Sequence, residues 1–348
     1  MSKKCFVAYA TGTGLIAAAF CASPAFAKDQ SAESFFKSVD HLTMVVASGA
    51  GGGYDRIARL VARNLQQMLP GHPRIVIQDM PGAGGVLATN FLANSAPKDG
   101  STIMAGTNSA LALPIYNSPV AHYDPRKFAW IGSTGKQQAI CVTWKTSPIK
   151  TLQDAMTHVV TVSATAINNG PGMYPNILNA MLGTKFKVVT GYDTSGMRLA
   201  VERGEVDGLC GLALQTYEAI GSSWFKDKKV HVIAQMGLHK NPQLPNVPLV
   251  RDLLKSPDDR KVFDLIVLPQ EFGRPFLAPP GTPADRMALY RKAFRAMLKS
   301  KQFLAEAKKQ RVVIEPMGGR KIEALLKKAY KAPAAVRARA AAFEGVTH

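Results

Sequence analysis

The stretch from residue 42 to residue 106 alternates strand-like and helix-like patterns, and this alternation restricts the fold more than any other feature of the chain. Three short apolar runs are typical of strands: Leu42–Ala47, Arg74–Gln78 and Ser101–Gly106. Between them, apolar residues recur at helical spacing from Asp55 to Leu69 and from Val86 to Asn94. A strand–helix–strand–helix–strand order is typical of a mainly parallel sheet flanked by helices. The sequence therefore predicts an α/β fold.

A second series of strands and helices begins after residue 150. Its predicted strands are Val159–Ala164, Phe186–Thr190, Asp207–Leu212 and Val230–Ala234, and its predicted helices are Tyr174–Leu182 and Ser195–Arg203. The last part of the chain is expected to add the helix Ala284–Lys299, the strand Arg311–Glu315 and the helix Lys321–Tyr330. Two such series in one chain indicate two α/β lobes.

The length and composition of the chain fit two lobes. The 348 residues are 47% hydrophobic and only 19% charged, which excludes a disordered chain and leaves enough apolar material for a large core. We predict that residues 28–136 form the first part of lobe one and that residues 137–262 form lobe two. Residues 263–348 are predicted to return to lobe one and to end in C-terminal helices.

Two glycine-rich segments, Ser48–Asp55 and Pro81–Gly85, join predicted strands of the first lobe to the helices that follow. Glycine lets main-chain N–H groups approach a ligand without obstruction by a Cβ atom. The start of a helix adds unpaired N–H groups and a partial positive charge. Consecutive parallel strands end at the same sheet edge, so both loops should meet there. The pair predicts an anion site, for example for a carboxylate; simple tight turns are the alternative.

The second lobe has loops of the same kind. Asn168–Gly172 and Gly191–Gly196 each follow a predicted strand and precede a helix, so we expect them to face the same cleft as the loops of the first lobe. Asp55 and Asp193 are candidates for an acid–base pair. Each also stands at the start of a helix, where Asp is favoured as a cap, and capping is the preferred interpretation.

The first 27 residues have the pattern of a secretory signal peptide. Met1–Lys4 is positively charged, Phe6–Ala22 is uncharged and mostly apolar, and Ala25–Ala27 (AFA) resembles a cleavage site. A membrane anchor is the alternative, but Thr11–Gly14 interrupts the apolar stretch that an anchor would need. We therefore predict that residues 1–27 are cleaved and that the protein is secreted.

The net charge of the chain is +19 and invites the hypothesis of a nucleic-acid-binding protein. Removal of residues 1–27 takes away two lysines, which leaves 41 basic and 24 acidic residues and a charge of +17. These charges are spread over helix faces, so we expect no nucleic-acid partner. The seven histidines are scattered singly, and the chain lacks the G-x-S-x-G, H-E-x-x-H, Walker and C-x-x-C motifs. We expect no metal, no cofactor and no catalytic residues.

Two of the four cysteines, Cys141 and Cys210, lie outside the predicted signal peptide. A secreted protein meets an oxidising environment, in which a disulfide between them is chemically permitted. Both cysteines also lie in apolar, strand-like surroundings, where two buried thiols are equally compatible with the sequence. The sequence leaves these two alternatives open.

The run from Gly51 to Ile103 (GGGYDRIARLV … QDMPGAGG … PKDGSTI) resembles the substrate-binding proteins of tripartite tricarboxylate transporters, also called Bug-type receptors. Further matches to this family occur in the same order along the chain: YDPRKFAWIGS at 123–133, LAVERGEVDG at 199–208, LPNVP at 244–248 and FLAPPGTPAD at 276–285. Together these motifs cover nearly the whole chain after residue 27.

The resemblance implies a periplasmic binding protein of the two-lobed type II, or Venus-flytrap, fold. Such a receptor captures a small organic carboxylate in a cleft between its lobes and delivers it to the integral-membrane permease subunits of the transporter. The family's ligand loops correspond in the first lobe to Ala50, Gly51, Gly52, Gly53, Tyr54, Gly82, Ala83, Gly84 and Gly85, with Asn108 and Ser109 after the third strand. In the second lobe they correspond to Asn169, Gly170, Gly172, Met173, Tyr192, Asp193 and Thr194.

The chain departs from the family pattern where a ligand would be selected. Gly49–Gly52 (GAGG) replaces the usual Pro-Gly-Gly opening, and Gly191–Thr194 (GYDT) replaces a Tyr-Lys-Gly loop. An Asp in place of a Lys argues against a highly charged ligand, and aromatic or amide-bearing carboxylates remain open. A secreted enzyme acting on a small carboxylate is the alternative function. We expect the receptor to be a monomer.

Overall fold

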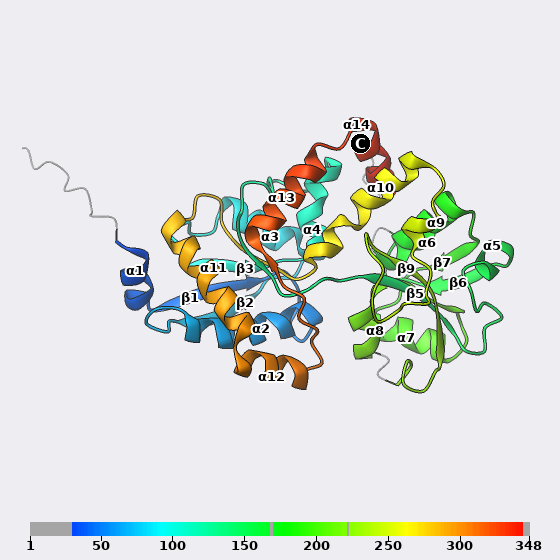
Figure 1. Ribbon diagram of the computed structural model, residues 1–348, viewed down its shortest axis with the longest axis horizontal. Coiled ribbons are helices and arrows are strands. Elements are labelled where there is room, and N and C mark those ends of the chain that lie inside the picture. Colours follow the sequence, from blue (N-terminus) through cyan, green and yellow to red (C-terminus); the bar gives the residue numbers. More distant parts are fainter. Residues whose placement is uncertain (1–29, 168–169, 221–222, 344–348) are drawn as a thin grey trace, which may run out of the picture.

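Two β-sheets, each covered by helices on both faces, form two lobes that lie side by side (Figure 1). The computed structural model describes residues 30–167, 170–220 and 223–343. The predicted signal peptide, residues 1–27, lies outside the described residues. Within the described part, no helix is both long and apolar enough to cross a membrane. The prediction of a two-lobed α/β fold is confirmed.

The six-stranded sheet of the first lobe has the order β11-β4-β10-β3-β1-β2. Its strands are β1 (His41–Val46), β2 (Arg74–Asp79), β3 (Thr102–Ala105), β4 (Ala129–Ser133), β10 (Pro275–Ala278) and β11 (Met317–Gly318). β1 pairs in parallel with β2 and with β3, as the strand–helix alternation predicts. β10 is inserted antiparallel between β3 and β4, so the sheet is mixed rather than purely parallel.

The five-stranded sheet of the second lobe has the order β7-β6-β8-β5-β9. Its strands are β5 (Ala139–Trp144), β6 (Val160–Ser163), β7 (Phe186–Val189), β8 (Gly208–Ala213) and β9 (Val230–Met236). β6 pairs in parallel with β7 and β8, and β5 runs antiparallel between β8 and β9. Apart from β11, the two sheets have the same topology. Each contains one strand that runs antiparallel to its neighbours, β10 in the first lobe and β5 in the second. Each of these two strands directly follows a segment in which the chain passes from one lobe to the other.

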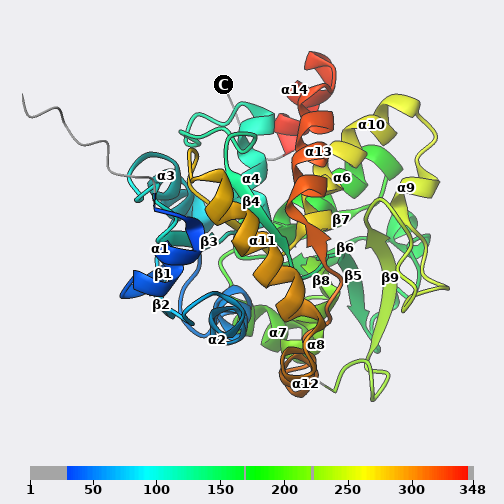
Figure 2. The same ribbon diagram turned by 60° about the vertical axis from the view of Figure 1, so that its left-hand side comes forward.

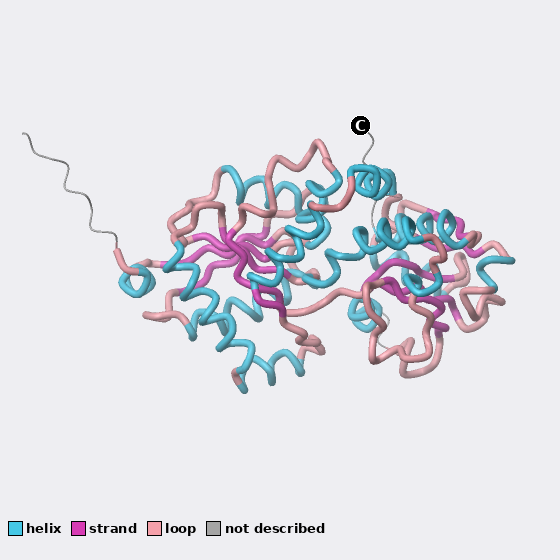
Figure 3. Tube along the Cα trace, turned by 45° about the horizontal axis from the view of Figure 1, so that its top comes forward, coloured by secondary structure: helices cyan, strands magenta, loops and turns pink. Residues whose placement is uncertain are grey.

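Helices cover both faces of each sheet because successive strand side chains point to opposite faces. In the first lobe Met44 and Val46 of β1 contact the core under one set of helices, α1 (Ala32–Ser38), α2 (Gly53–Leu65), α11 (Ala284–Lys299) and α12 (Lys301–Lys309). Val45 belongs to the core on the other face, under α3 (Val86–Asn94), α4 (Asn108–Ala112) and α13 (Gly319–Tyr330). Figures 2 and 3 show this three-layer arrangement from two other directions.

The second lobe has the same layers. α7 (Thr194–Glu202) and α8 (Leu214–Ile220) cover one face of its sheet. The other face is covered by α5 (Asp154–Thr157), α6 (Gly170–Leu182), α9 (Val250–Leu253), α10 (Pro257–Val267) and α14 (Ala334–Phe343). Cys141 of β5 lies opposite Cys210 of β8, and their sulfur atoms are joined in a disulfide.

The chain crosses between the lobes twice in the described residues before its last helix. The first crossing runs from β4 to β5 through residues 134–138, and the second runs through α10 and the short 3-10 helix Leu268–Phe272 into β10. The predicted second boundary, between residues 262 and 263, falls inside α10. The C-terminal helix α14 packs against α10, against α6 and against the 3-10 helix Leu113–Tyr116 of the first lobe.

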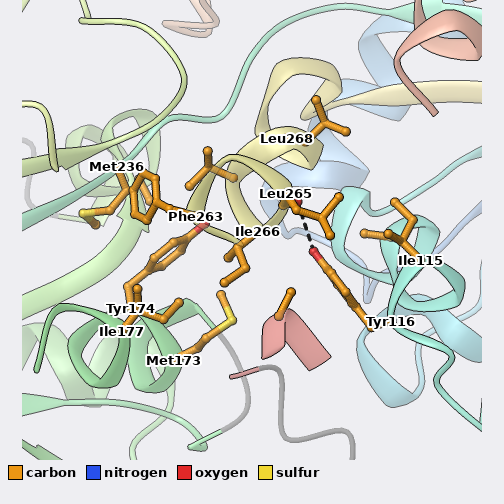
Figure 4. Packing of buried hydrophobic residues seen from close by; sticks show 14 of the residues in the cluster. Ile115, Tyr116, Met173, Tyr174, Ile177, Met236, Phe263, Leu265, Ile266 and Leu268 are labelled. Atoms are coloured by element: carbon orange, nitrogen blue, oxygen red, sulfur yellow. Dashed lines mark hydrogen bonds between the residues drawn. The ribbon is translucent and has the colours of Figure 1, made fainter. Parts of the chain in front are cut away.

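One hydrophobic core runs through both lobes at this junction. Phe263, Leu265 and Ile266 of α10 lie between Tyr174 of α6 and Tyr116 of the first lobe (Figure 4). The Tyr116 hydroxyl donates to the carbonyl of Leu265 at 3.3 Å. The helix α10 is therefore packed against both lobes, which places it at the cleft.

The predicted strand at Arg311–Glu315 is wrong. The segment is irregular, Arg311 has a left-handed φ of 57°, and the main-chain N–H of Glu315 donates to Thr134 outside any strand. The β-strand that follows is only Met317–Gly318. The apolar residues Val312 and Ile314 alternate as in a strand, but they pack against the core as side chains of a loop.

Candidate functional site

A cavity of about 840 Å³ lies between the two lobes. The first lobe contributes main-chain loops and the start of α4: Tyr54, Ala83, Gly84, Asn108, Ser109 and Leu113. The second lobe contributes the start of α6 and the end of β8: Gly170, Pro171, Met173, Tyr174, Gly211, Leu212 and Ala213. The crossings add Gln137, Ile266, Pro269 and Gln270. Both lobes and both crossings therefore meet at one site.

The first glycine loop is fixed by a carboxylate at the start of α2. Gly51 has a φ of 79°, and its N–H donates to Asp55 Oδ2 at 2.7 Å. Arg59 Nε lies 2.7 Å from Asp55 Oδ1, and the Asp55 side chain is only 3% exposed. Burial alone would raise the pKa of Asp55, but the hydrogen bonds from Arg59 and Gly51 outweigh it and lower the pKa. Asp55 therefore stays charged and fixes the first glycine loop to the first turn of α2, although the N-cap position itself is Gly52.

Substitution of Asp55 by Asn is expected to destabilise the protein by about 2 kcal/mol at pH 7, because the Gly51 N–H and Arg59 lose a charged acceptor. The folded-state pKa of Asp55 is lowered, so its contribution is present above the unfolded carboxyl value of about 4 and is lost as the pH falls through the folded value. Urea unfolding at a series of pH values between about 3 and 7 measures both effects, because this range includes the pH at which Asp55 becomes protonated in the unfolded chain.

Asp193→Asn is the matched control for Asp55→Asn. Asp193 caps α7 by accepting from the Gly196 N–H at 2.5 Å, but it is exposed. Because Asn caps a helix about as well as Asp, we expect a loss below about 0.5 kcal/mol. Equal losses in the two variants would contradict the assigned role of Asp55.

The second glycine loop turns sharply into α3. Four successive residues, Gly82, Ala83, Gly84 and Gly85, have positive φ angles, and of these Ala83 and Gly84 line the cavity. A Cβ atom added at Gly85 would lie 2.4 Å from Thr107 Oγ1, so the loop and the end of β3 pack too closely for any side chain. At Gly84, in contrast, an added Cβ meets no heavy atom of the described residues within 4 Å. The loop therefore presents bare main chain to the cavity at Gly84.

A chain of hydrogen bonds forms the polar wall of the cavity. The Gln137 amide nitrogen donates to Tyr54 Oη at 2.7 Å and to the Gly273 carbonyl at 2.8 Å, and its oxygen accepts from Arg274 Nη2 at 3.2 Å. This amide orientation is preferred to the opposite one because it pairs both polar atoms of Gln137. Tyr54 Oη in turn donates to Asn108 Oδ1 at 2.9 Å.

The same wall continues to the second crossing. Asn108 Nδ2 donates to the Pro269 carbonyl at 3.2 Å, and the next residue, Gln270, donates through Nε2 to the Tyr174 hydroxyl. Gln270 Oε1 also accepts from the Ala139 N–H at 3.0 Å. Burial raises the pKa of Tyr54, so its hydroxyl remains protonated and can donate. The wall thus consists of neutral groups that donate and accept hydrogen bonds.

The predicted site residues divide into two groups. Those that line the cavity are Tyr54, Ala83, Gly84, Asn108, Ser109, Gly170 and Met173. Those that stand outside its lining are Ala50, Gly51, Gly52, Gly53, Gly82, Gly85, Gly172, Tyr192 and Asp193. The side chain of Thr194 is not described. Asn169 lies outside the described residues. Asp55 and Asp193 each accept a main-chain hydrogen bond at a helix start, in different lobes.

Gln137, Tyr174 and Gln270 also line the cavity and were not among the predicted site residues. The predicted residues lie in loops between a strand and a helix or at the start of a helix, whereas Gln137 and Gln270 lie on the crossings and Tyr174 lies one turn into α6. Gln137 stands two residues after a glycine (GKQQ) and Gln270 directly follows a proline (LPQ), but such a signal is too common to identify a site.

The sequence profile described as "Tripartite tricarboxylate transporter family receptor" (TctC) matches residues 57–335. The chain belongs to this family. A member from Cupriavidus necator, "UPF0065 protein in gbd 5'region", is 24% identical over 222 residues, 61% of this chain and 64% of the relative. The matched part of the chain thus spans less than two thirds of that relative's length. Family and fold are both those of substrate-binding receptors.

Solved structures of TctC-type proteins share the fold. The crystal structure of a TctC solute-binding protein from Polaromonas has a TM-score of 0.65 at 15% identity and covers 88% of this chain and 96% of the other. The MatC protein of Rhodopseudomonas palustris, solved with bound malate, has a TM-score of 0.62 at 20% identity and covers 87% of this chain and 99% of MatC. Both comparisons support the two-lobed arrangement.

Proposed function

We propose that this TctC-family protein is a periplasmic receptor that captures a small organic carboxylate in the cavity between its lobes. It then delivers the ligand to the membrane permease of a tripartite tricarboxylate-type transporter. The observation that carries the proposal is the cavity of about 840 Å³, which is lined by both lobes and by both crossings. A site at a junction of this kind closes when the lobes move about the crossings. Residues 1–27 act as the export signal, and the receptor works as a monomer without a cofactor.

The carboxylate is held at the first-lobe side of the cavity. Ala83 and Gly84 present main chain there, and the hydroxyls of Tyr54 and Ser109 and the amides of Asn108 and Gln137 lie beside them. Malate, the ligand of the MatC protein, is itself a carboxylate. Residues 28–136 form the first part of lobe one and residues 137–262 form lobe two. Residues 263–348 return to lobe one and end in C-terminal helices, of which α14 packs against both lobes.

A thermal-shift screen of organic acids tests this proposal. A ligand that binds only the folded state adds about 2.7 kcal/mol of stability at 100 times its Kd. For a chain of this size we expect a rise in melting temperature of about 4 °C. The corresponding amides serve as controls and should give smaller shifts. If no organic acid raises the melting temperature, the carboxylate-receptor function is contradicted.

A further inference from the structure

The wall of the cavity carries no ionisable side chain other than tyrosine, among the described residues. Its polar members are neutral hydroxyls and amides, and the rest are apolar or main chain. The nearby ions Lys136 and Glu271 pair with each other at 2.8 Å. A ligand charge therefore finds no opposite charge in direct contact on this wall.

One cation lies directly behind the polar wall. The Arg274 guanidinium lies over the Tyr54 ring, 5.1 Å from its centroid, and Nη2 contacts the Gln137 amide. Its Nη1 atom is buried and has no hydrogen-bond partner among the residues that the structure describes. A Cβ atom added at Gly53 would lie 3.4 Å from Nη1, so the cation also adjoins the start of α2.

Arg274 makes no ion pair with any residue that the structure describes, and its surroundings are Tyr54 and Arg56 rather than a carboxylate. Burial lowers its pKa, but a guanidinium keeps its proton in a protein. A buried charge without a partner is costly. An anion bound on the other side of Tyr54 and Gln137 would offset that cost.

Among the described residues, the far end of the cavity carries no cationic side chain that could pair with a second carboxylate. α4 begins with the polar residues Asn108 and Ser109 and leads to Leu113, a distance of roughly 7 Å along the helix. Leu113, Val120, Met173 and Ile266 line the cavity beyond its polar wall. A second carboxylate there would lose its hydration without gaining a cation.

We propose that the cavity selects monocarboxylates with an uncharged, mainly apolar body, and that Arg274 is the positioning residue that favours their single negative charge. Arg274 acts through Tyr54 and Gln137, which it holds and polarises, rather than by touching the ligand. This inference rests on the proposed receptor function and adds the class of ligand to it. It distinguishes this chain from the MatC protein, whose bound malate is a dicarboxylate.

Isothermal titration of the full mature protein with matched probes tests the ligand class. The monocarboxylates are hexanoate and phenylacetate, the dicarboxylates are adipate and malate, and hexanamide is the uncharged counterpart of hexanoate. We expect one of the monocarboxylates to bind at least about tenfold more tightly than either dicarboxylate and than hexanamide. Tighter binding of a dicarboxylate would overturn the inference and leave the receptor function intact. Binding of none of the four acids would contradict both.

Variants of Arg274 test the role of the cation. Arg274→Met should reduce the preference for hexanoate over hexanamide by about tenfold, and Arg274→Lys should retain most of it. Arg56→Met is the control, because Arg56 is a nearby but exposed cation that donates to the Gln310 carbonyl. A merely structural role would weaken acid and amide equally, and that result would overturn the assignment. The comparison of probes on the unmodified protein does not depend on whether Arg274→Met folds.

Discussion

Replacement of Gly84 by Val is expected to weaken carboxylate binding by about 100-fold or more, equal to about 2.7 kcal/mol. Gly84 lines the cavity, and an added Cβ there meets no heavy atom within 4 Å in the described part of the chain. The valine side chain would therefore occupy cavity volume beside the loop. The φ of 64° also disfavours a β-branched residue by about 1–2 kcal/mol. Titration with the best acid from the thermal screen measures the loss of affinity.

Gly183→Val is the matched control for the strain at Gly84. Gly183 has a φ of 71° and is exposed at the end of α6, and a Cβ added there likewise meets no heavy atom within 4 Å among the described residues. It lies outside the cavity lining, so Gly183→Val should lose similar stability but keep its affinity. Unchanged binding by Gly84→Val would show that the second glycine loop does not contact the ligand.

The elements with a clear periodicity could be predicted from the sequence. The helix Val86–Asn94 has the predicted bounds, and α2 begins at Gly53, two residues before the predicted start at Asp55. The parallel pairing of β1 with its two neighbours follows from the same alternation, because the intervening helices force a crossover. Local pattern was sufficient where one helix connects two adjacent strands.

The position of β10 could not be predicted in the same way. It pairs through four residues, Pro275–Ala278, with β3 and β4, which lie more than 140 residues earlier in the chain. The pairing of β10 with these strands depends on the long-range packing of the core and on the path of the second crossing. Neither is visible in the local sequence. The same holds for Gln137 and Gln270, which reach the site only because the crossings bring them together.

The position of Arg274 changes the electrostatic account of the site. The glycine loops predicted an anion site made only of main-chain N–H groups, and Gly84 does face the cavity. Arg274 immediately precedes β10, so the strand that was hardest to place also brings a cation to the back of Tyr54. Main-chain donors and one charge that does not touch the ligand attract an anion more weakly than a direct ion pair would, which fits the proposed role of a receptor that releases its ligand.

Loss of the disulfide between Cys141 and Cys210 is expected to cost about 3–4 kcal/mol of stability. The two cysteines are 69 residues apart in sequence. In the chain-entropy model, a crosslink that closes a loop of that length lowers the conformational entropy of the unfolded state and so raises its free energy by about 4 kcal/mol. Both side chains are fully buried between β5 and β8. Denaturant unfolding of Cys141→Ala/Cys210→Ala, compared with the oxidised protein, measures the difference.

Reduction of the unmodified protein separates the effect of the crosslink from that of the lost side chains. Since the covalent bond constrains mainly the unfolded chain, the reduced protein should unfold at nearly the same denaturant concentration as the double alanine variant. Any difference in stability between the reduced protein and the double alanine variant would measure the cost of the small cavity that the alanines leave in the sheet. Thiol labelling of the exported protein in denaturant should find no free cysteine. Two reactive thiols, or equal stability of the oxidised and reduced proteins, would show that β5 and β8 are held together by packing and hydrogen bonds alone.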